Sequence, residues 1–95
     1  MTPASVAIVF GTRPEAIKLA PVYEEMLSRR GLRPVLIATG QHREMLGQVL
    51  EVFDLEPDLS FDIMQHDQSL AQLTSRATVA LETAFDEQEP DLVMV

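Results

Sequence analysis

Short apolar runs alternate along the chain with longer segments in which apolar residues recur every three or four positions. Val6–Phe10 is the clearest run, and its β-branched residues without polar interruption are typical of a strand buried on both faces. Val35–Thr39 and Leu92–Val95 follow the same pattern, and Leu59–Met64 predicts a shorter strand. Helices are predicted between these strands, from Pro14 to Arg30, from Arg43 to Phe53, and from a cap at Ser69 to about Phe85.

Three local signals mark the ends and the interior of these helices. Ser69, followed three positions later by Gln72, forms a capping box for the third helix. Gly31 is a suitable terminator for the first helix. Pro21 lies deep inside that helix, where a proline removes one backbone hydrogen bond and costs roughly 3 kcal/mol. We therefore expect a kink or irregular first turns in the first helix.

The order of the predicted elements is β-α-β-α-β-α-β, which indicates an α/β fold. Strands that alternate with long helices form a parallel sheet with helices on both faces, so we expect a three-layer Rossmann-like architecture. Ligands of such sheets bind beyond the carboxyl ends of the strands. The last predicted strand reaches Val95 without the loop and helix that would follow it, so we expect residues 1–95 to be part of a larger protein.

Composition narrows the class of protein. The chain has 95 residues, enough for one domain, and its apolar content of 46% is typical of a globular fold. It has no cysteine, which excludes disulfides, thiolate metal ligands and a cysteine nucleophile. No apolar run is long enough for a signal peptide or a membrane span, so we expect a cytoplasmic protein without a membrane partner.

Charge is distributed unevenly along the chain. The net charge of -8 argues against a nucleic-acid partner. Residues 1–50 carry six Lys or Arg and four Asp or Glu, whereas residues 51–95 carry one Arg and eleven Asp or Glu. The second half is therefore predicted to expose a solubilising acidic surface. Arg13, Lys18 and Arg43 lie instead close to predicted helix starts, on the side where parallel strands end.

The segment after the first strand combines the features of an anion site. Gly11 and Thr12 form a predicted turn. Arg13 and Lys18 flank the start of the first helix, where backbone N–H groups and the helix dipole favour negative charge. The three glycines of a dinucleotide fingerprint and the second glycine of a Walker loop are missing, so a non-standard phosphate or other anion site is predicted. The alternative is that Arg13 pairs with Glu15 or a distant carboxylate while Lys18 is solvated.

A second group of polar residues follows the next predicted strand. His42 is suited to three roles, a general base, an anion donor or a simple helix cap, of which the cap is the commonest. Gln41 can donate and accept hydrogen bonds, which suits sugar hydroxyls or a uracil edge. Gln68 belongs to the same predicted rim. His42 and His66 lie in separate loops without metal-ligand spacing, so no metal site is predicted.

The longest motifs resemble the start of a known family, the bacterial non-hydrolysing UDP-N-acetylglucosamine 2-epimerases. The segments that carry this resemblance are Phe10–Val22, Thr39–Leu46, Asp62–Met64, Gln68–Arg76 and Pro90–Val95. The resemblance implies the first half of the N-terminal Rossmann-like domain of a two-domain, glycosyltransferase-B-type fold. It implies interconversion of UDP-N-acetylglucosamine and UDP-N-acetylmannosamine for cell-envelope polysaccharide precursors. The implied route is elimination of UDP to a glycal and re-addition after inversion at the second carbon of the sugar, without a cofactor.

The resemblance also implies which residues bind the substrate. Arg13 and Lys18 match family positions that contact the nucleotide sugar, where positive charge would stabilise diphosphate as a leaving group. Gly11 and Thr12 belong to the same substrate-binding motif. The acid and base carboxylates of the family lie further along its sequence, so no catalytic residue is expected within this chain. The C-terminal domain is expected outside it, the 95-residue chain alone is predicted to be inactive, and the intact enzyme is expected to be a homodimer.

A second nucleotide-sugar site is implied as well. Gln41, His42 and Gln68 match positions that in bacterial members help to bind a second, activating UDP-N-acetylglucosamine. Glu44 stands where some regulated members have glutamine, and Asp67 where some have arginine. A carboxylate near a diphosphate is unfavourable, so these two departures weaken the prediction of a regulatory site.

Two other functions remain open at this point. A glycosyltransferase of the same two-domain architecture would transfer the sugar to an acceptor, whereas an epimerase needs none. A non-enzymatic UDP-sugar-binding module would bind the nucleotide sugar without turnover. Epimerisation without any acceptor separates the epimerase from the transferase, whereas measurable UDP-sugar affinity of this chain alone would favour the binding module.

Overall fold

The computed structural model describes residues 2–40, 43–63 and 67–95, with only the backbone of residues 43–46. The elements follow the predicted order, and each lies within a few residues of its predicted bounds except β3, of which only two residues are extended. In chain order they are β1 (Ala4–Phe10), α1 (Arg13–Leu27), β2 (Leu32–Ala38), α2 (Arg43–Val52), β3 (Leu59–Ser60), α3 (Leu70–Gln88) and β4 (Leu92–Met94).

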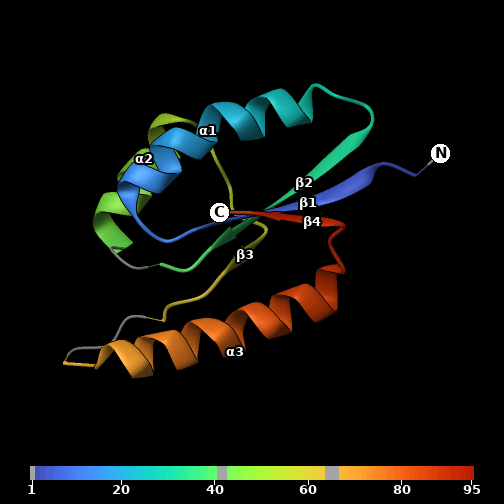
Figure 1. Ribbon diagram of the computed structural model, residues 1–95. Coiled ribbons are helices and arrows are strands. Elements are labelled where there is room, and N and C mark those ends of the chain that lie inside the picture. The colour runs from blue at the N-terminus through green and yellow to red at the C-terminus, as the bar shows by residue number, and fades with distance from the viewer. Residues whose placement is uncertain (1, 41–42, 64–66) are drawn as a thin grey trace.

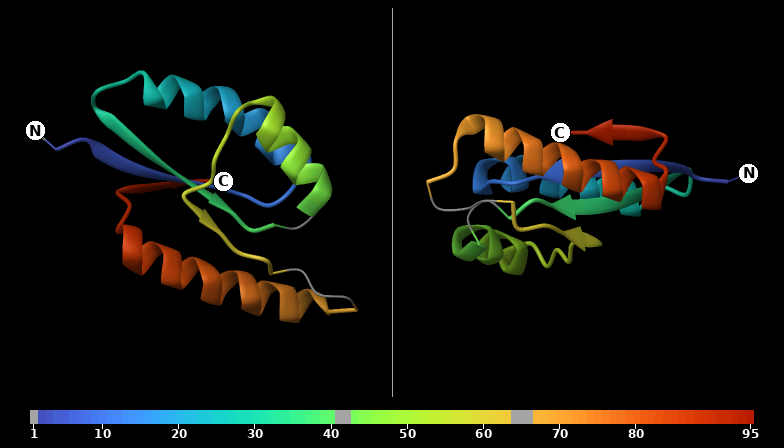
Figure 2. Two further views of the ribbon diagram at one scale, coloured as in Figure 1. Left: turned by 180° about the vertical axis from the view of Figure 1, so that it is seen from behind. Right: turned by 90° about the horizontal axis from the view of Figure 1, so that it is seen from below.

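The strands form one parallel sheet between two layers of helices. The order within the described residues is β3-β2-β1-β4, so β1 and β2 are the inner strands. β1 pairs with β2 along its whole length, from Ala4 opposite Leu32 to Phe10 opposite Ala38. Figures 1 and 2 show α1 and α2 on one face of the sheet and α3 on the other. The predicted three-layer Rossmann-like α/β fold is confirmed.

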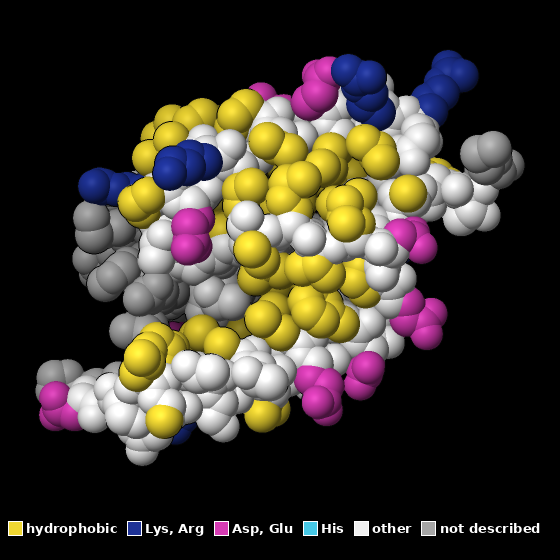
Figure 3. Space-filling view, in the orientation of Figure 1, with side chains coloured by type: hydrophobic (Ala, Val, Ile, Leu, Met, Phe, Trp, Pro, Cys, Tyr) yellow, Lys and Arg dark blue, Asp and Glu magenta, His cyan; other side chains and the backbone are white. Residues whose placement is uncertain are grey.

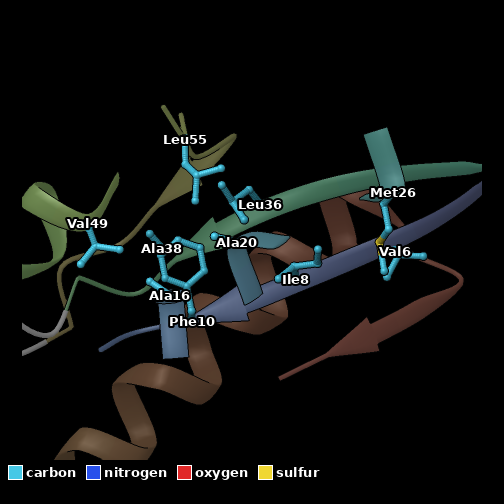
Figure 4. Close-up of a cluster of buried hydrophobic side chains, with 10 residues drawn as sticks. All are labelled: Val6, Ile8, Phe10, Ala16, Ala20, Met26, Leu36, Ala38, Val49 and Leu55. Carbon is cyan, nitrogen blue, oxygen red and sulfur yellow. The ribbon is translucent and has the colours of Figure 1, made fainter. Parts of the chain in front are cut away.

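β1 supplies both hydrophobic cores. Val6, Ile8 and Phe10 point toward α1 and α2, while Ala7 and Val9 point toward α3, as expected for alternating side chains of a strand. The first core is completed by Ala16, Ala20, Met26, Leu36, Ala38, Val49 and Leu55 (Figure 4), and the second by Val35, Ile37 and Ala84. The prediction that Val6–Phe10 is buried on both faces is therefore confirmed.

The end of α1 differs from its prediction. The helix ends at Leu27 rather than at Arg30, and Gly31 lies in the turn that follows. After Leu27 the backbone bonds reach back three residues instead of four: the Ser28 N–H donates to the carbonyl oxygen of Glu25 at 3.2 Å, and the Arg29 N–H donates to that of Met26 at 3.1 Å. The Oγ of Ser28 donates to the same Glu25 carbonyl at 2.7 Å. The prediction that Gly31 terminates the helix is therefore wrong.

Pro21 does not interrupt α1. The helix is continuous from Arg13 to Leu27, so the predicted irregularity of its first turns is wrong. Pro21 lies on the exposed side of the helix. Water can therefore reach the carbonyl group of Ile17, which a proline four residues later leaves without an N–H donor.

Each edge strand begins at the leucine of a Pro-Asp-Leu tripeptide, and both aspartates bind the neighbouring inner strand in the same way. The Asp58 N–H donates to the carbonyl oxygen of Leu36 at 2.8 Å, and the Asp58 carboxylate accepts the Leu36 N–H at 2.7 Å. Asp91 forms the same pair of bonds with Ser5, at 2.8 and 2.7 Å. Each carboxylate thus replaces a backbone acceptor of the ladder and fixes where its edge strand begins.

One surface of the molecule is strongly apolar. Leu92 is 56% exposed, Val93 42% and Val95 87%, at and just beyond the edge strand β4. Figure 3 shows apolar side chains gathered across the middle of this face. Among the described residues, no helix is long and apolar enough to cross a membrane.

The aspartate at the start of β4 is predicted to stabilise the fold. Asp91→Ala leaves the N–H of buried Ser5 without its acceptor, so the free energy of unfolding should fall by about 1–3 kcal/mol in urea denaturation. Asp86→Ala is the matched control, since Asp86 is exposed and makes no hydrogen bond or ion pair with a described residue. An equal, small loss in both variants would contradict the assigned role.

Candidate functional site

Backbone hydrogen bonds join the carboxyl ends of β1, β2 and the segment after β3. Thr39 donates both its N–H, at 2.9 Å, and its hydroxyl, at 3.3 Å, to the carbonyl oxygen of Phe10. Phe61 donates its N–H to Ala38 at 2.7 Å, and Ile63 donates to Thr39 at 3.3 Å. This edge of the sheet is where ligands of parallel α/β sheets bind, and the predicted site residues emerge from it.

The turn after β1 is held by a residue of the helix that follows it. Gly11 is buried, and Thr12 caps α1 with an extended backbone. The Glu15 carboxylate folds back onto this turn, and its Oε2 accepts the N–H of Gly11 at 2.7 Å and the N–H of Thr12 at 3.1 Å. These two backbone donors, which the sequence offered to an external anion, are therefore already occupied.

Arg13 is the first residue of α1 and is exposed. Its side chain makes no hydrogen bond or ion pair with Glu15 or with any other described residue, so the alternative in which Arg13 pairs with Glu15 is wrong. Its side chain borders a cavity of about 280 Å³ between α1 and α2, and the other lining residues are Ile17, Gln48, Val49, Val52 and Phe53. The guanidinium is thus available at the edge of an otherwise mostly apolar recess.

Lys18 lies on the side of α1 that faces away from the sheet. Ala16 is buried against the sheet, and Lys18, two residues later, lies about 200° around the helix from it. Lys18 therefore starts from the outer side of α1 and is exposed. Its side chain makes no hydrogen bond or ion pair with a described residue, so the long side chain is free to reach a ligand above the helix start.

The structure describes the second predicted site only in part. Gln41 and His42 lie outside the described residues, and Gln68 is half-buried just before the cap of α3. Gly40, two residues after β2, has φ +70°, and a Cβ atom there would lie 2.8 Å from the carbonyl oxygen of Phe61. A cavity of about 230 Å³ lies beside Gly40, lined also by Ala38, Gly47, Leu50, Ser60, Phe61 and Asp62.

Sequence reasoning missed the role of Glu15. The signal was present, because Thr12 followed three positions later by glutamate is the spacing of a capping box. It was interpreted only as a possible partner of Arg13. Gln48 was also missed, and its place in the wall beside Arg13 follows from how α1 and α2 pack, which no local pattern reveals.

Metal ligands and residues with a shifted pKa are the other groups that could take part in chemistry at this edge. Within residues 2–40, 43–63 and 67–95, no three His, Cys, Asp or Glu side chains come close enough to hold a metal ion. Burial raises the pKa of Tyr23 in the middle of α1, and the negative charge of Asp58 raises it further. Tyr23 packs against the core below α1 and Asp58 binds Leu36 of β2, so neither belongs to the turn after β1.

Comparison with known proteins identifies what the chain is similar to. The family model described as UDP-N-acetylglucosamine 2-epimerase matches residues 24–95. The UDP-N-acetylglucosamine 2-epimerase of Bacillus subtilis is 44% identical over 95 residues, which are 100% of this chain and 25% of the relative. The enzyme of Campylobacter jejuni is 41% identical over 90 residues, 95% of this chain and 24% of its own length. The chain therefore spans about a quarter of the length of these curated relatives.

Solved structures agree with the sequence comparison. A crystal structure of a UDP-N-acetylglucosamine 2-epimerase matches 99% of this chain and 26% of its own, with a TM-score of 0.93 and 44% identity. The enzyme of Neisseria meningitidis, solved with bound UDP-GlcNAc, matches 94% of this chain and 24% of its own, with a TM-score of 0.87 and 42% identity. At these identities the fold and the family are shared.

Gly40, just after β2, is predicted to stabilise the fold more than any residue with a side chain at that position would. Gly40→Ala should lower the free energy of unfolding by about 1–2 kcal/mol for the left-handed backbone alone, with more for the contact with Phe61. Gly31→Ala is the control, since no atom lies within 4 Å of its Cβ position and its φ is not positive. Urea denaturation of both variants measures the difference, and equal stabilities would show that the Gly40 conformation is not required.

Proposed function

Since the chain belongs to the UDP-N-acetylglucosamine 2-epimerase family, we propose that it forms the nucleotide-sugar-binding part of such an enzyme. The reaction is the interconversion of UDP-N-acetylglucosamine and UDP-N-acetylmannosamine. The observation that carries the proposal is the match of the whole chain, at 44% identity, to the Bacillus subtilis epimerase. The UDP-GlcNAc bound in the Neisseria meningitidis structure supports the choice of ligand.

Arg13 and Lys18 hold the diphosphate in this proposal. Both are exposed, and neither side chain makes a hydrogen bond or ion pair with a described residue that a ligand would have to break. Arginine can bind phosphate oxygens through two hydrogen bonds, while lysine adds a mobile point charge. Negative charge grows on the diphosphate as UDP leaves the sugar, so both cations stabilise the transition state more than the ground state. Gly11 and Thr12 shape the turn from which Arg13 emerges.

The proton transfers belong to groups outside residues 1–95. UDP is eliminated to give a glycal, and it is added again after inversion at the second carbon of the sugar. The described residues offer cations and polar donors at the edge of the sheet rather than a pair of carboxylates facing the Arg13 recess. Within this proposal, the part of the active site built by this chain binds and stabilises the leaving group.

Gln41, His42 and Gln68 bind a second UDP-N-acetylglucosamine in this proposal. The cavity beside Gly40 supports it, because it lies at the carboxyl ends of β2 and β3, next to the segment that contains Gln41 and His42. Amide and imidazole groups can donate hydrogen bonds to sugar hydroxyls and phosphate oxygens. Glu44 and Asp67 place carboxylates in the same segments and would weaken binding of a diphosphate.

The wider architecture is part of the proposal. Residues 1–95 are the first part of an N-terminal Rossmann-like domain, and a second domain of glycosyltransferase-B type closes over the edge that carries Arg13. The apolar surface around β4 supports the presence of further protein beside this edge strand, since exposed patches of this kind often mark sites of protein contact. The intact enzyme is a homodimer that works in the cytoplasm and supplies precursors of cell-envelope polysaccharides.

An exchange experiment tests the function directly. The first quarter of the Bacillus subtilis epimerase is replaced by this chain, which aligns with it over all 95 residues. The chimera should convert UDP-N-acetylglucosamine to UDP-N-acetylmannosamine without any acceptor. A folded chimera that requires an acceptor would favour a transferase, and one that binds UDP-N-acetylglucosamine without turnover would favour a binding module.

Arg13 is predicted to act on the leaving group. Arg13→Ala in the active chimera should lower kcat/KM by about 10²- to 10³-fold, the usual effect of removing one donor to a developing oxyanion. Arg30→Ala is the matched control, since Arg30 is exposed in the turn that follows the opposite end of α1, and its side chain makes no hydrogen bond or ion pair with a described residue. Similar kinetics of the two variants would rule out the role assigned to Arg13.

A further inference from the structure

The turn after β1 already contains an anion that belongs to the chain itself. Oε2 of Glu15 lies 2.7 Å from the Gly11 nitrogen and 3.1 Å from the Thr12 nitrogen. Loops of this shape, between a strand and a helix N-terminus, usually offer such N–H groups to phosphate. Here a carboxylate occupies the position that a phosphate oxygen would take.

The remaining backbone donors at the helix start are few. Pro14 has no N–H, and the Ala16 N–H donates to the carbonyl oxygen of Thr12 at 3.1 Å. At most the N–H groups of Arg13 and Glu15 are left, whereas a phosphate cradle uses several consecutive donors. The helix N-terminus is therefore a poor binding site as long as Glu15 stays in place.

Glu15 holds this position with two advantages over a free anion. It is attached to the same helix, so it competes at the high effective concentration of an intramolecular group. Its own negative charge also repels a second anion from the turn. Displacement of the carboxylate would leave the partly buried Gly11 N–H in need of another acceptor.

We infer that Glu15 is a specificity-determining residue that closes the backbone anion site of this turn against small free anions such as inorganic phosphate. An anionic ligand must then be held by the side chains of Arg13 and Lys18, which lie outside the closed turn. For the diphosphate of a UDP-sugar this consequence rests on the proposed function. The closure of the turn itself does not rest on the proposed function, because it concerns only inorganic phosphate and the amides of Gly11 and Thr12.

Amide chemical shifts of the ¹⁵N-labelled 95-residue chain during titration with inorganic phosphate test the closure. The wild-type Gly11 and Thr12 amides should not respond, whereas Glu15→Ala should show saturable shifts at these two amides. Glu15→Gln keeps an oxygen acceptor on the same side chain without the charge, and it should restore most of the protection. Glu24→Ala removes the same charge from an exposed position of α1 without a hydrogen bond to a described residue, and it should behave as wild type.

Two results would overturn the inference. Saturable phosphate shifts at Gly11 and Thr12 in the wild-type chain would show that the turn is open. A folded Glu15→Ala chain without such shifts would show that Glu15 is not what closes it. If Glu15→Ala does not fold, Glu15→Gln decides, because phosphate shifts at Gly11 in that variant would also contradict closure by hydrogen bonding. None of these readouts requires epimerase activity, so they fail or succeed independently of the proposed function.

Discussion

The burial of β1 from both sides is the constraint on which the structure depends. All residues from Val6 to Phe10 are at most 9% exposed. A strand without a polar face is stable only between two helical layers, which requires crossover helices and parallel neighbours. β2 pairs with β1 along its full length, so the carboxyl ends of both strands reach the same edge. The position of the candidate site follows from this pairing rather than from the site residues themselves.

At that edge, the Glu15 carboxylate binds the backbone N–H groups of the turn instead of the nearby Arg13 side chain. Glu15 binds the backbone of the turn, and Arg13 is left exposed beside the recess between α1 and α2. The result is a turn whose N–H groups are already bonded and which carries exposed cations. Such an arrangement suits a leaving group whose charge grows during reaction, because a guanidinium can bind its oxygens through two hydrogen bonds.

The fold was predictable from the sequence because it depends on burial and periodicity, which short patterns express directly. Val6–Phe10 and the Ser69 cap both predicted their elements correctly. Gly31 and Pro21 misled the prediction. The backbone hydrogen bonds already tighten at Ser28 and Arg29, before Gly31 is reached, and Pro21 lies on the exposed side of a helix that stays continuous. The site was harder to predict, because the sequence shows charge and spacing but not which acceptor reaches a donor first. At the turn after β1, the Glu15 carboxylate is close enough to accept the N–H groups of Gly11 and Thr12.

The central claim is that the carboxyl end of β1 and the start of α1 bind the diphosphate of a UDP-sugar. Titration of the ¹⁵N-labelled chain with UDP, against uridine as the control, tests this most directly, with the Arg13 side-chain Nε–H as the reporter. The account predicts that UDP but not uridine shifts this resonance and the amides from Arg13 to Lys18. UDP shifts confined to the opposite end of the sheet, around Gly31 and Glu89, or identical responses to UDP and uridine, would contradict it.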